Sequence, residues 1–235
     1  MRIIEPAFIV ETRLNGEEIL KTIERFTRKC YKSEHKTTET SYLEFVPRVF
    51  QTRKHRGIIE HCSVSVTFFT DRGVTHELVR HRIASYLQES TRYCNYAVNG
   101  RFRGVTFVMP PWLEAGTEDF LLWSGVMADA ERNYNRLLQR GWKPEEARDA
   151  LPHATKAEIT ATLNLGSWHN FFVKRVVAGA HPKMRQLAVP LLRAFQERIP
   201  VLFADILCPQ LPYREAREIH NESQLQEVLT GEIAA

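Results

Sequence analysis

Residues 63–93 read SVSVTFFTDRGVTHELVRHRIASYLQESTRY, and this stretch carries the clearest structural pattern in the chain. In its first seven residues Val64, Val66 and Phe68 alternate with serine and threonine. Strict alternation of apolar and polar side chains predicts a half-buried β-strand. The sequence Thr-Asp-Arg-Gly at residues 70–73 then predicts a turn.

A helix is expected after this turn, from about Val74 to Ser85. Its apolar residues Val79, Ile83 and Tyr86 have the spacing i, i+4, i+7. Side chains with this spacing share one face of a helix, so the pattern predicts that they face the core.

Similar patterns predict strands and helices on both sides of this stretch. The expected strands are an opening strand within residues 1–14, a short one at Val105–Val108 and one at Lys156–Leu165. The expected helices run from a cap at Thr117 to Gly141, from Pro144 to Pro152, from a cap at Ser167 to about Ala178, and onward from Pro182. The helix predicted after Thr117 carries Phe120, Met127, Ala130, Tyr134 and Leu137. The helix predicted after Pro182 turns Met184, Leu187, Leu191 and Phe195 inward. Residues 34–56 are expected to be the most mobile loop.

These elements predict a mixed α/β (α+β) fold in which long helices flank a small mixed sheet. We expect one domain over residues 1–235, because the chain shows no repeat, low-complexity segment or Gly/Ser linker. The composition is that of a globular protein, with 43% hydrophobic and 26% charged residues.

Composition also narrows the functional classes. No run approaches the roughly 20 apolar residues of a membrane-spanning helix. Glu5 and Glu11 interrupt the apolar start of the chain, which argues against a signal peptide, so a cytoplasmic protein is expected. The net charge of +4 and the pI of about 8.9 favour polyanionic ligands, either nucleic acid or nucleotides.

The cysteines Cys30, Cys62, Cys94 and Cys208 lie far apart and form no CxxC pair. Zinc sites and secreted disulfide scaffolds normally show closer pairing or more cysteine. We therefore expect reduced cysteines that serve as packing residues.

Basic residues gather at Arg80-His81-Arg82, and Arg92 follows them. Adjacent helical residues project about 100° apart, so the three cannot all bind one small ligand. Arginine forms bidentate bonds to phosphate, and Ser90-Thr91-Arg92 offers two hydroxyls and a guanidinium within three residues. The pattern predicts a phosphate site, although a solvated basic surface would show the same residues.

The spacing of this cluster identifies a resemblance. Arg80-His81-Arg82, seven further residues and then Ser90, with Arg92-Tyr93 adjoining, resembles the signature of the flavin-dependent thymidylate synthase family. The order and approximate spacing of further matches agree over residues 28–200.

The resemblance implies a set of site residues. Those implied for FAD are His55, Gly57, Arg80, His81, Arg82, Gln88, Asn164 and Asn170. Those implied for dUMP are Glu77, Arg80, Gln88, Glu89, Ser90, Thr91, Arg92, Arg148 and Arg175. The family's reaction is the reductive methylation of dUMP to dTMP, with methylenetetrahydrofolate as one-carbon donor and NADPH as reductant through FAD. The resemblance also implies a homotetramer with shared active sites, folate as a further ligand and no required nucleic acid or metal.

No cysteine lies in the Pro-Cys-His context of the other thymidylate synthase class, so substrate activation must come from another residue. The resemblance implies that Arg175 holds the pyrimidine, and Arg175 is therefore the predicted activating residue. A guanidinium on the pyrimidine edge would stabilise negative charge as the N3 proton is lost. Ser90 is interpreted as a phosphate ligand, because no histidine and carboxylate accompany it in a triad order.

Three positions depart from the family pattern. Glu77 replaces a common glutamine, Leu87-Gln88 replaces a common Asn-Glu pair, and Gly166 replaces a frequent basic residue. These departures put individual contacts in doubt, chiefly the charge balance around the nucleotide.

Two other functional classes remain open from the residues themselves. Arg92-Tyr93 and Arg101-Phe102-Arg103 would suit a nucleic-acid-binding module, in which aromatic rings stack on bases. His55, Glu60 and His61 could belong to a metal hydrolase.

Overall fold

The computed structural model describes residues 1–98 and 103–231. Its main feature is a five-stranded mixed sheet in the order β4-β6-β3-β2-β7, where only β2 and β7 pair in parallel. These strands are β2 (Ala7–Val10), β3 (Ser63–Asp71), β4 (Ser85–Gln88), β6 (Lys156–Asn164) and β7 (Arg217–Glu218). A second, two-stranded parallel sheet pairs β1 (Arg2–Ile4) with β5 (Thr106–Val108).

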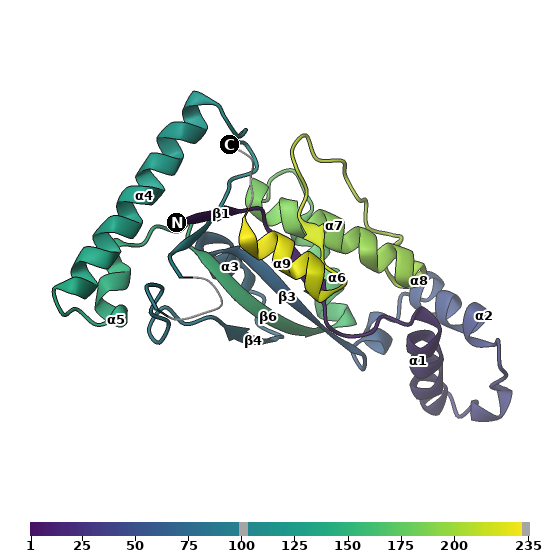
Figure 1. Cartoon of the computed structure of the whole chain (residues 1–235). Coiled ribbons are helices and arrows are strands. Elements are labelled where there is room, and N and C mark those ends of the chain that lie inside the picture. Colours follow the sequence, from purple (N-terminus) through teal and green to yellow (C-terminus); the bar gives the residue numbers. More distant parts are fainter. Residues whose placement is uncertain (99–102, 232–235) are drawn as a thin grey trace.

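The helices surround the larger sheet, as Figure 1 shows. They are α1 (Gly16–Cys30), α2 (Tyr42–Pro47), α3 (Arg72–Leu78), α4 (Glu118–Gln139), α5 (Pro144–Ala147), α6 (Leu165–Arg175), α7 (Pro182–Arg198), α8 (Pro200–Phe203) and α9 (Glu222–Thr230). Short 3₁₀ or π turns occupy Glu34–Lys36, Arg48–Thr52, Arg56–Ile59 and Arg148–Ala150. The predicted fold class, a mixed α/β protein with a small mixed sheet and long helices, is confirmed.

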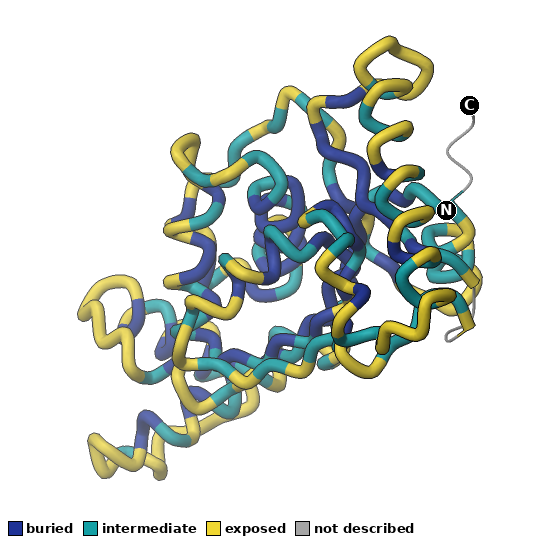
Figure 2. The backbone as a smooth tube through the Cα atoms, turned by 90° about the vertical axis from the view of Figure 1, so that its left-hand side faces the viewer, coloured by how far each residue is buried: buried dark blue, intermediate teal, exposed yellow. Residues whose placement is uncertain are grey.

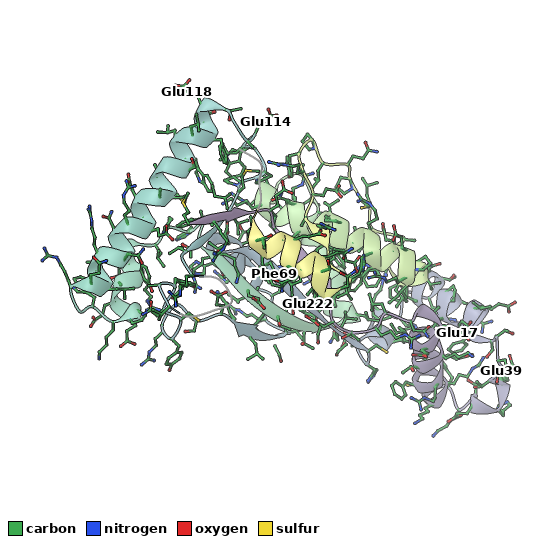
Figure 3. All side chains as sticks on the ribbon, viewed as in Figure 1. Glu17, Glu39, Phe69, Glu114, Glu118 and Glu222 are labelled. Atoms are coloured by element: carbon green, nitrogen blue, oxygen red, sulfur yellow. The ribbon has the colours of Figure 1, made fainter. Side chains whose placement is uncertain are left out.

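The two ends of the molecule are helical. In Figure 1 α4 stands at one end and α1 with α2 at the other, and in Figure 3 Glu118 and Glu17 mark these ends. Among the described residues, no helix combines the length and the apolar character needed to cross a membrane.

The two faces of the sheet are covered differently. Val64, Val66 and Phe68 enter the main core with α6 and α7, as predicted. The strand is half-buried only at its start, because Thr67 on the other face is buried as well. Phe69 turns to the opposite face and packs in a smaller cluster with residues of α9 (Figure 3). Figure 2 shows the buried segments in the middle of the molecule and the exposed ones on its outer turns.

Trp168 fixes the orientation of α6. Its ring is fully buried, and its indole N–H donates to the carbonyl of Val64 on β3 at 3.0 Å. Phe171 and Phe172 pack beside it, with ring centroids 5.4 Å and 5.8 Å from the Trp168 ring. Because this face of α6 is anchored in the core, its other face is held at a fixed position relative to the sheet.

The predicted helix over residues 74–85 is wrong in its second half. Helix α3 ends at Leu78, and β4 begins at Ser85 and pairs with β6. The hydroxyl of Tyr86 lies 2.8 Å from the carbonyl oxygens of Leu78 and His81, which stabilises the chain reversal between them. Val79 and Ile83, predicted to face the core, are 39% and 77% exposed. Residues 85–88 pair with the edge of β6, and this pairing outweighs the helical spacing of the apolar residues.

The predicted loop over residues 34–56 is also wrong in part. Five residues of α2 and the π turn after it are buried in the main core: Tyr42, Phe45, Val46, Val49 and Phe50. The prediction of a loop rested on the polar first half of the segment, whereas its second half is apolar.

The remaining helices agree more closely. Thr117 caps α4, and Met127 and Tyr134 of its predicted apolar side are buried. Helix α7 begins at Pro182 as predicted. The cap of α6 differs from the prediction, because Asn164 accepts the backbone N–H of Ser167 at 2.7 Å.

Glycine at position 16 permits a close contact between the first helix and the seventh. A β-carbon there would overlap the carbonyl oxygen of Arg198, the last residue of α7. The start of α1 therefore packs directly on the end of α7, backbone against backbone.

Candidate functional site

A cavity of about 520 Å³ runs along the outer face of α6. Ser167, Asn170 and Lys174 line it, and their spacing of three and four residues places them on one face of the helix. The opposite wall is the segment between α3 and β4, which contributes Arg80 to Ile83. Asn164, Gly166, Arg175 and Glu60 complete the lining.

The cavity is strongly cationic. Arg80, Arg82 and Lys174 are exposed, and among the described residues their side chains form no hydrogen bond or ion pair. Glu60 is the one carboxylate among the lining residues. Unpaired guanidinium and ammonium groups around a concave surface favour an anionic ligand.

Arg175 lies at the last turn of α6 and is held by three hydrogen bonds. Its Nε donates to Nε2 of His81 at 2.9 Å, Nη1 to the Glu77 carboxylate at 2.7 Å, and Nη2 to the Glu77 carbonyl at 3.2 Å. Both partners belong to the α3–β4 region, 98 and 94 residues away in sequence. The fold therefore joins three residues that sequence analysis had assigned to the site separately.

His81 is uncharged at neutral pH. Burial lowers its pKa to about 4, and the positive charges of Arg175 and Lys174 act in the same direction. The ring also stands edge-on to Phe171, with the centroids 5.0 Å apart. A neutral imidazole can accept the Arg175 N–H at Nε2, provided that its proton is on Nδ1.

A second polar group lies beyond the other end of β4. The Arg148 guanidinium donates to the Thr91 hydroxyl at 3.3 Å, and the Arg92 backbone N–H donates to the Ser90 hydroxyl at 3.2 Å. The Arg92 side chain forms an ion pair with Glu145 at 2.8 Å. The structure thus brings Arg148 next to Ser90, Thr91 and Arg92, four residues that the resemblance assigns to dUMP.

Glu89, the residue before Ser90, is bonded to three residues around this second group. Its carboxylate accepts from Lys156 and from the hydroxyl of Tyr96, each at 2.8 Å, and its carbonyl accepts from Arg72 at 3.3 Å. Burial, followed by the charge of Glu89, raises the pKa of Tyr96. Because its carboxylate is already bonded twice, Glu89 acts in this structure as a support for the turn.

Strand β4 separates the two groups. Its four residues, at about 3.3 Å each, span on the order of 13 Å. Gln88, predicted to touch both ligands, donates to the Thr75 hydroxyl on α3 at 3.1 Å. Within one chain the cationic cavity and the Ser90 turn are therefore neighbouring but distinct.

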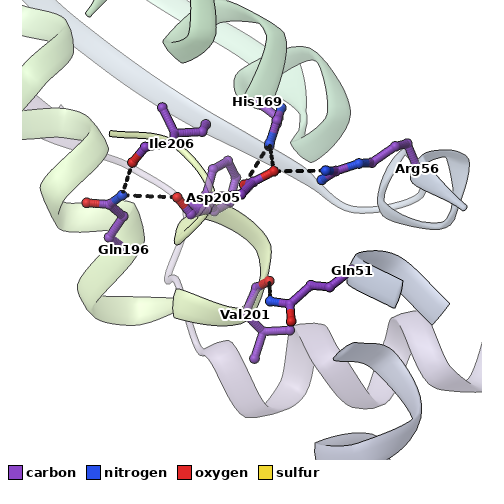
Figure 4. Close-up of polar contacts among 8 residues, drawn as sticks. Gln51, Arg56, His169, Gln196, Val201, Asp205 and Ile206 are labelled. Carbon is purple, nitrogen blue, oxygen red and sulfur yellow. Dashed lines mark hydrogen bonds and ion pairs between the residues drawn. The ribbon is translucent and has the colours of Figure 1, made fainter. Parts of the chain in front are cut away.

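His55 and Gly57 do not line the cavity. His55 is exposed and lies 2.8 Å from the hydroxyl of Tyr31. Arg56, between His55 and Gly57 in the sequence, forms an ion pair with Asp205 at 2.8 Å. His169 contacts the same Asp205 carboxylate at 3.0 Å (Figure 4). These partners lower the pKa of Asp205 against the effect of its burial. This junction ties the segment before Glu60 to α6.

Several residues of the site were not among those predicted to bind FAD or dUMP. Lys174, Ser167, Ile83 and Glu60 line the cavity, and Lys156 and Tyr96 bond Glu89. The i, i+3, i+7 spacing of Ser167, Asn170 and Lys174 was the available signal for the cavity face of α6.

Gly166 lies where a larger side chain would be crowded. A β-carbon there would stand 3.0 Å from Cγ of Glu60 and 3.4 Å from Oδ1 of Asn164. Glycine at this position, one of the departures from the family pattern, therefore allows Glu60 to lie close to the start of α6.

The two other functional classes gain no structural support. Within residues 1–98 and 103–231, no group of three or more histidine, cysteine, aspartate or glutamate residues is arranged to hold a metal ion. Of the suggested ligands, His61 contacts the ring of Phe26. Of the suggested base-stacking residues, Arg92 pairs with Glu145, and Arg101 and Phe102 lie outside the described residues.

The sequence pattern of a known family, described as "Thymidylate synthase complementing protein", matches residues 14–201. A flavin-dependent thymidylate synthase of Pyrococcus abyssi is 33% identical over 195 residues, which cover 80% of this chain and 79% of that protein. The chain belongs to the flavin-dependent thymidylate synthase family. The relative from Geobacter sulfurreducens is 31% identical over 187 residues, 76% of this chain and 78% of that protein.

Two solved structures share the fold. The UMP/dUMP methylase PolB of Streptomyces cacaoi superposes with a TM-score of 0.71 at 18% identity, covering 89% of this chain and 100% of PolB. The flavin-dependent thymidylate synthase ThyX of Helicobacter pylori, solved with FAD and dUMP, has a TM-score of 0.64 at 23% identity, covering 86% and 99%. The prediction of an FAD-dependent thymidylate synthase enzyme is confirmed at the level of the family.

Proposed function

We propose that this enzyme catalyses the reductive methylation of dUMP to dTMP, with methylenetetrahydrofolate as one-carbon donor and NADPH as reductant through FAD. The observation that carries the proposal is the cationic cavity along α6, in which Arg175 is held beside the unpaired Arg80, Arg82 and Lys174. Family membership supplies the reaction class.

The cavity fits the chemistry of FAD. The diphosphate of FAD is anionic, and Arg80, Arg82 and Lys174 are cations without an intramolecular partner among the described residues. Asn164 and Asn170 add amide groups that can donate to or accept from a flavin ring. When bound, FAD supplies the redox chemistry, since it takes electrons from NADPH.

The Ser90 turn fits the phosphate of dUMP. Ser90 and Thr91 offer hydroxyl groups, and Arg92 offers a guanidinium group on the same turn. Arg148, on the 3₁₀ turn Arg148–Ala150, adds a second guanidinium group beside Thr91. Arginine binds phosphate with two parallel N–H bonds, which fixes orientation as well as adding affinity. In this role Arg92 would exchange Glu145 for the nucleotide.

Arg175 is proposed as the catalytic residue. Its three bonds to Glu77 and His81 leave two of its five N–H groups for the pyrimidine edge. A fixed guanidinium stabilises negative charge that develops on the ring as the N3 proton is lost, without reorganising during the reaction.

The cysteines support a reaction without a thiol nucleophile. Burial raises the pKa of Cys62, Cys94 and Cys208, which lowers the fraction of thiolate at neutral pH. None of the three lines the cavity along α6.

We further propose that the active sites are shared between subunits of a homotetramer. Within one chain, β4 holds the cavity and the Ser90 turn on the order of 13 Å apart. A second subunit could place its Ser90 turn closer to the cavity than the same chain does.

The test combines a spectrum with a turnover assay. Purified protein reconstituted with FAD is expected to be yellow, NADPH is expected to bleach it, and dTMP should form from dUMP and methylenetetrahydrofolate. Arg175→Ala should lower kcat by about 10²- to 10³-fold, the usual effect of removing one charge-stabilising donor. The surface variant Arg217→Ala serves as control, because Arg217 pairs with Glu227 away from the cavity. A colourless protein that binds neither FAD nor dUMP in calorimetry would refute the proposal.

A further inference from the structure

We propose that Glu77 and His81 are positioning residues which clamp the Arg175 guanidinium in one orientation, so that its two remaining N–H groups face the substrate. This inference rests on the proposed function and deepens it. It gives two residues, assigned by resemblance to ligand binding, a role that acts through Arg175.

The donors of Arg175 divide unequally between protein and substrate. Arginine carries five N–H groups in a rigid fork. Three of them reach Glu77 and His81 at 2.7, 2.9 and 3.2 Å, and all three nitrogens are used. No other described residue accepts from this guanidinium. One N–H on each of Nη1 and Nη2 remains, which matches a bidentate contact with a planar acceptor.

The imidazole half of the clamp depends on a neutral ring. Nε2 can accept the Arg175 N–H while it carries no proton, and protonation would place two cations 2.9 Å apart. Burial disfavours protonation of the His81 ring, and the positive charges of Arg175 and Lys174 act in the same direction. The negative charge of Glu77 is paired with Arg175. The backbone of His81 is fixed as well, since its carbonyl lies 2.8 Å from the Tyr86 hydroxyl.

The carboxylate half of the clamp opposes the charge around it. Arg80, Arg82 and Lys174 would otherwise repel the Arg175 guanidinium from the cavity wall. A charge-assisted bond at 2.7 Å holds it in place. The side chains of Glu77 and Arg175 are 34% and 21% exposed, and exposed ion pairs contribute little to stability. The effect is therefore expected on orientation, not on folding.

Steady-state kinetics of the flavin-loaded enzyme test this role. Glu77→Gln keeps an acceptor but removes the charge, and His81→Ala removes the ring. Each should lower kcat by about 10- to 100-fold, the usual effect of a misplaced catalytic group, with less change in KM for dUMP. Glu77→Asp, which keeps the charge on a shorter stem, should recover part of the loss. An unchanged kcat in Glu77→Gln, or a loss confined to KM, would overturn the proposal.

The matched control is Glu215→Gln. Glu215 pairs with Arg193 at the same distance of 2.7 Å, on a surface away from the cavity. Removal of this carboxylate should leave both kcat and KM unchanged.

A second measurement needs no activity. In protein with ¹⁵N-labelled histidine, NMR should show His81 with its proton on Nδ1, an unprotonated Nε2 and no titration between pH 8 and 5. In Glu77→Gln the Nε2 signal should shift, because the guanidinium is no longer held. A His81 ring that is protonated on Nε2, or that titrates near pH 6.5, would contradict the clamp even if the proposed reaction were wrong.

Discussion

The two basic regions beside β4 differ in how their charges are compensated. Around the cavity along α6, Arg80, Arg82 and Lys174 have no charged partner among the described residues. Around the Ser90 turn, Arg92 is paired with Glu145 and Lys156 with Glu89. The first region offers three cations without a charged partner. In the second region Arg92 must give up Glu145 to bind an anion, whereas Arg148 bonds only the Thr91 hydroxyl.

This difference suggests how binding energy is distributed. A ligand in the cavity meets cations that lose only water, so its affinity should depend strongly on charge and salt. A phosphate at the Ser90 turn must displace Glu145 from Arg92, which reduces its net gain. We therefore expect charge changes to have larger effects in the cavity than at the turn.

The largest effect is expected when the free charge of the cavity is removed. The double variant Arg80→Gln/Arg82→Gln should weaken FAD binding by about 100-fold, since each charged hydrogen bond contributes roughly 1.5–3 kcal/mol and the effects need not add. Calorimetry at two salt concentrations would measure the affinity and its salt dependence. Arg193→Gln is the control for general loss of positive charge. Equal FAD affinity in the double variant would show that the cavity does not hold the diphosphate.

A smaller effect is expected at the turn. Ser90→Ala should weaken dUMP binding by about tenfold while turnover remains measurable, because a hydroxyl donor to phosphate is lost and no nucleophile is removed. Binding of dUMP and single-turnover rates would separate the two effects, with Ser124→Ala on α4 as control. Loss of the chemical step at unchanged dUMP affinity would instead make Ser90 a reacting group.

An opposite change is expected when the competing carboxylate is neutralised. Glu145→Gln releases Arg92 from its ion pair, so dUMP should bind about two- to fivefold more tightly. Glu227→Gln, which removes the partner of Arg217, controls for the added positive charge. Weaker binding of dUMP in Glu145→Gln would mean that Glu145 orients Arg92 and does not compete for it.

The smallest effect is expected on the pH dependence of stability, through His81 in the cavity wall. The pKa of folded His81 is about 4, below its ordinary 6.5, so between these values the unfolded chain binds a proton that the folded chain does not. The free energy of unfolding should therefore decrease as the pH falls from 6.5 towards 4. Solvent screening of this partly exposed ring limits the size of the effect. Urea unfolding at pH 7, 6 and 5 should show a shallower decrease in His81→Asn, and an identical slope would count against the neutral ring.

Elements with long, regular patterns were predictable from the sequence. The alternation at Val64, Val66 and Phe68 and the apolar stripe of α7 report burial directly, because one face of each element meets the core. Strand β4 was not predictable, since its four residues are too few to show a period and their conformation depends on pairing with β6. Local propensity gave way there to a tertiary contact.

The sequence pointed to several of the residues that the structure gathers beside β4, but not to the contacts between them. The spacing between Arg80 and Ser90 pointed to the two basic regions, yet nothing in the sequence links Glu77 to Arg175, which lies 98 residues later. Charge compensation was equally hidden, because the partner of Arg92 lies 53 residues away on α5. Side-chain pairing across such separations arises from the packing of elements and leaves no local pattern.

The direct contact of position 16 with the end of α7 limits how this enzyme can vary. Every residue except glycine carries the atom that would overlap the Arg198 carbonyl oxygen, so even alanine would force the two helices apart. In a library that randomises this codon, glycine should dominate among folded clones, whereas the neighbouring Glu17, on the solvent side, should accept many replacements. Intolerance at this position would thus reflect the docking of two helices outside the lining of the cavity along α6, and should not be mistaken for a sign of chemistry.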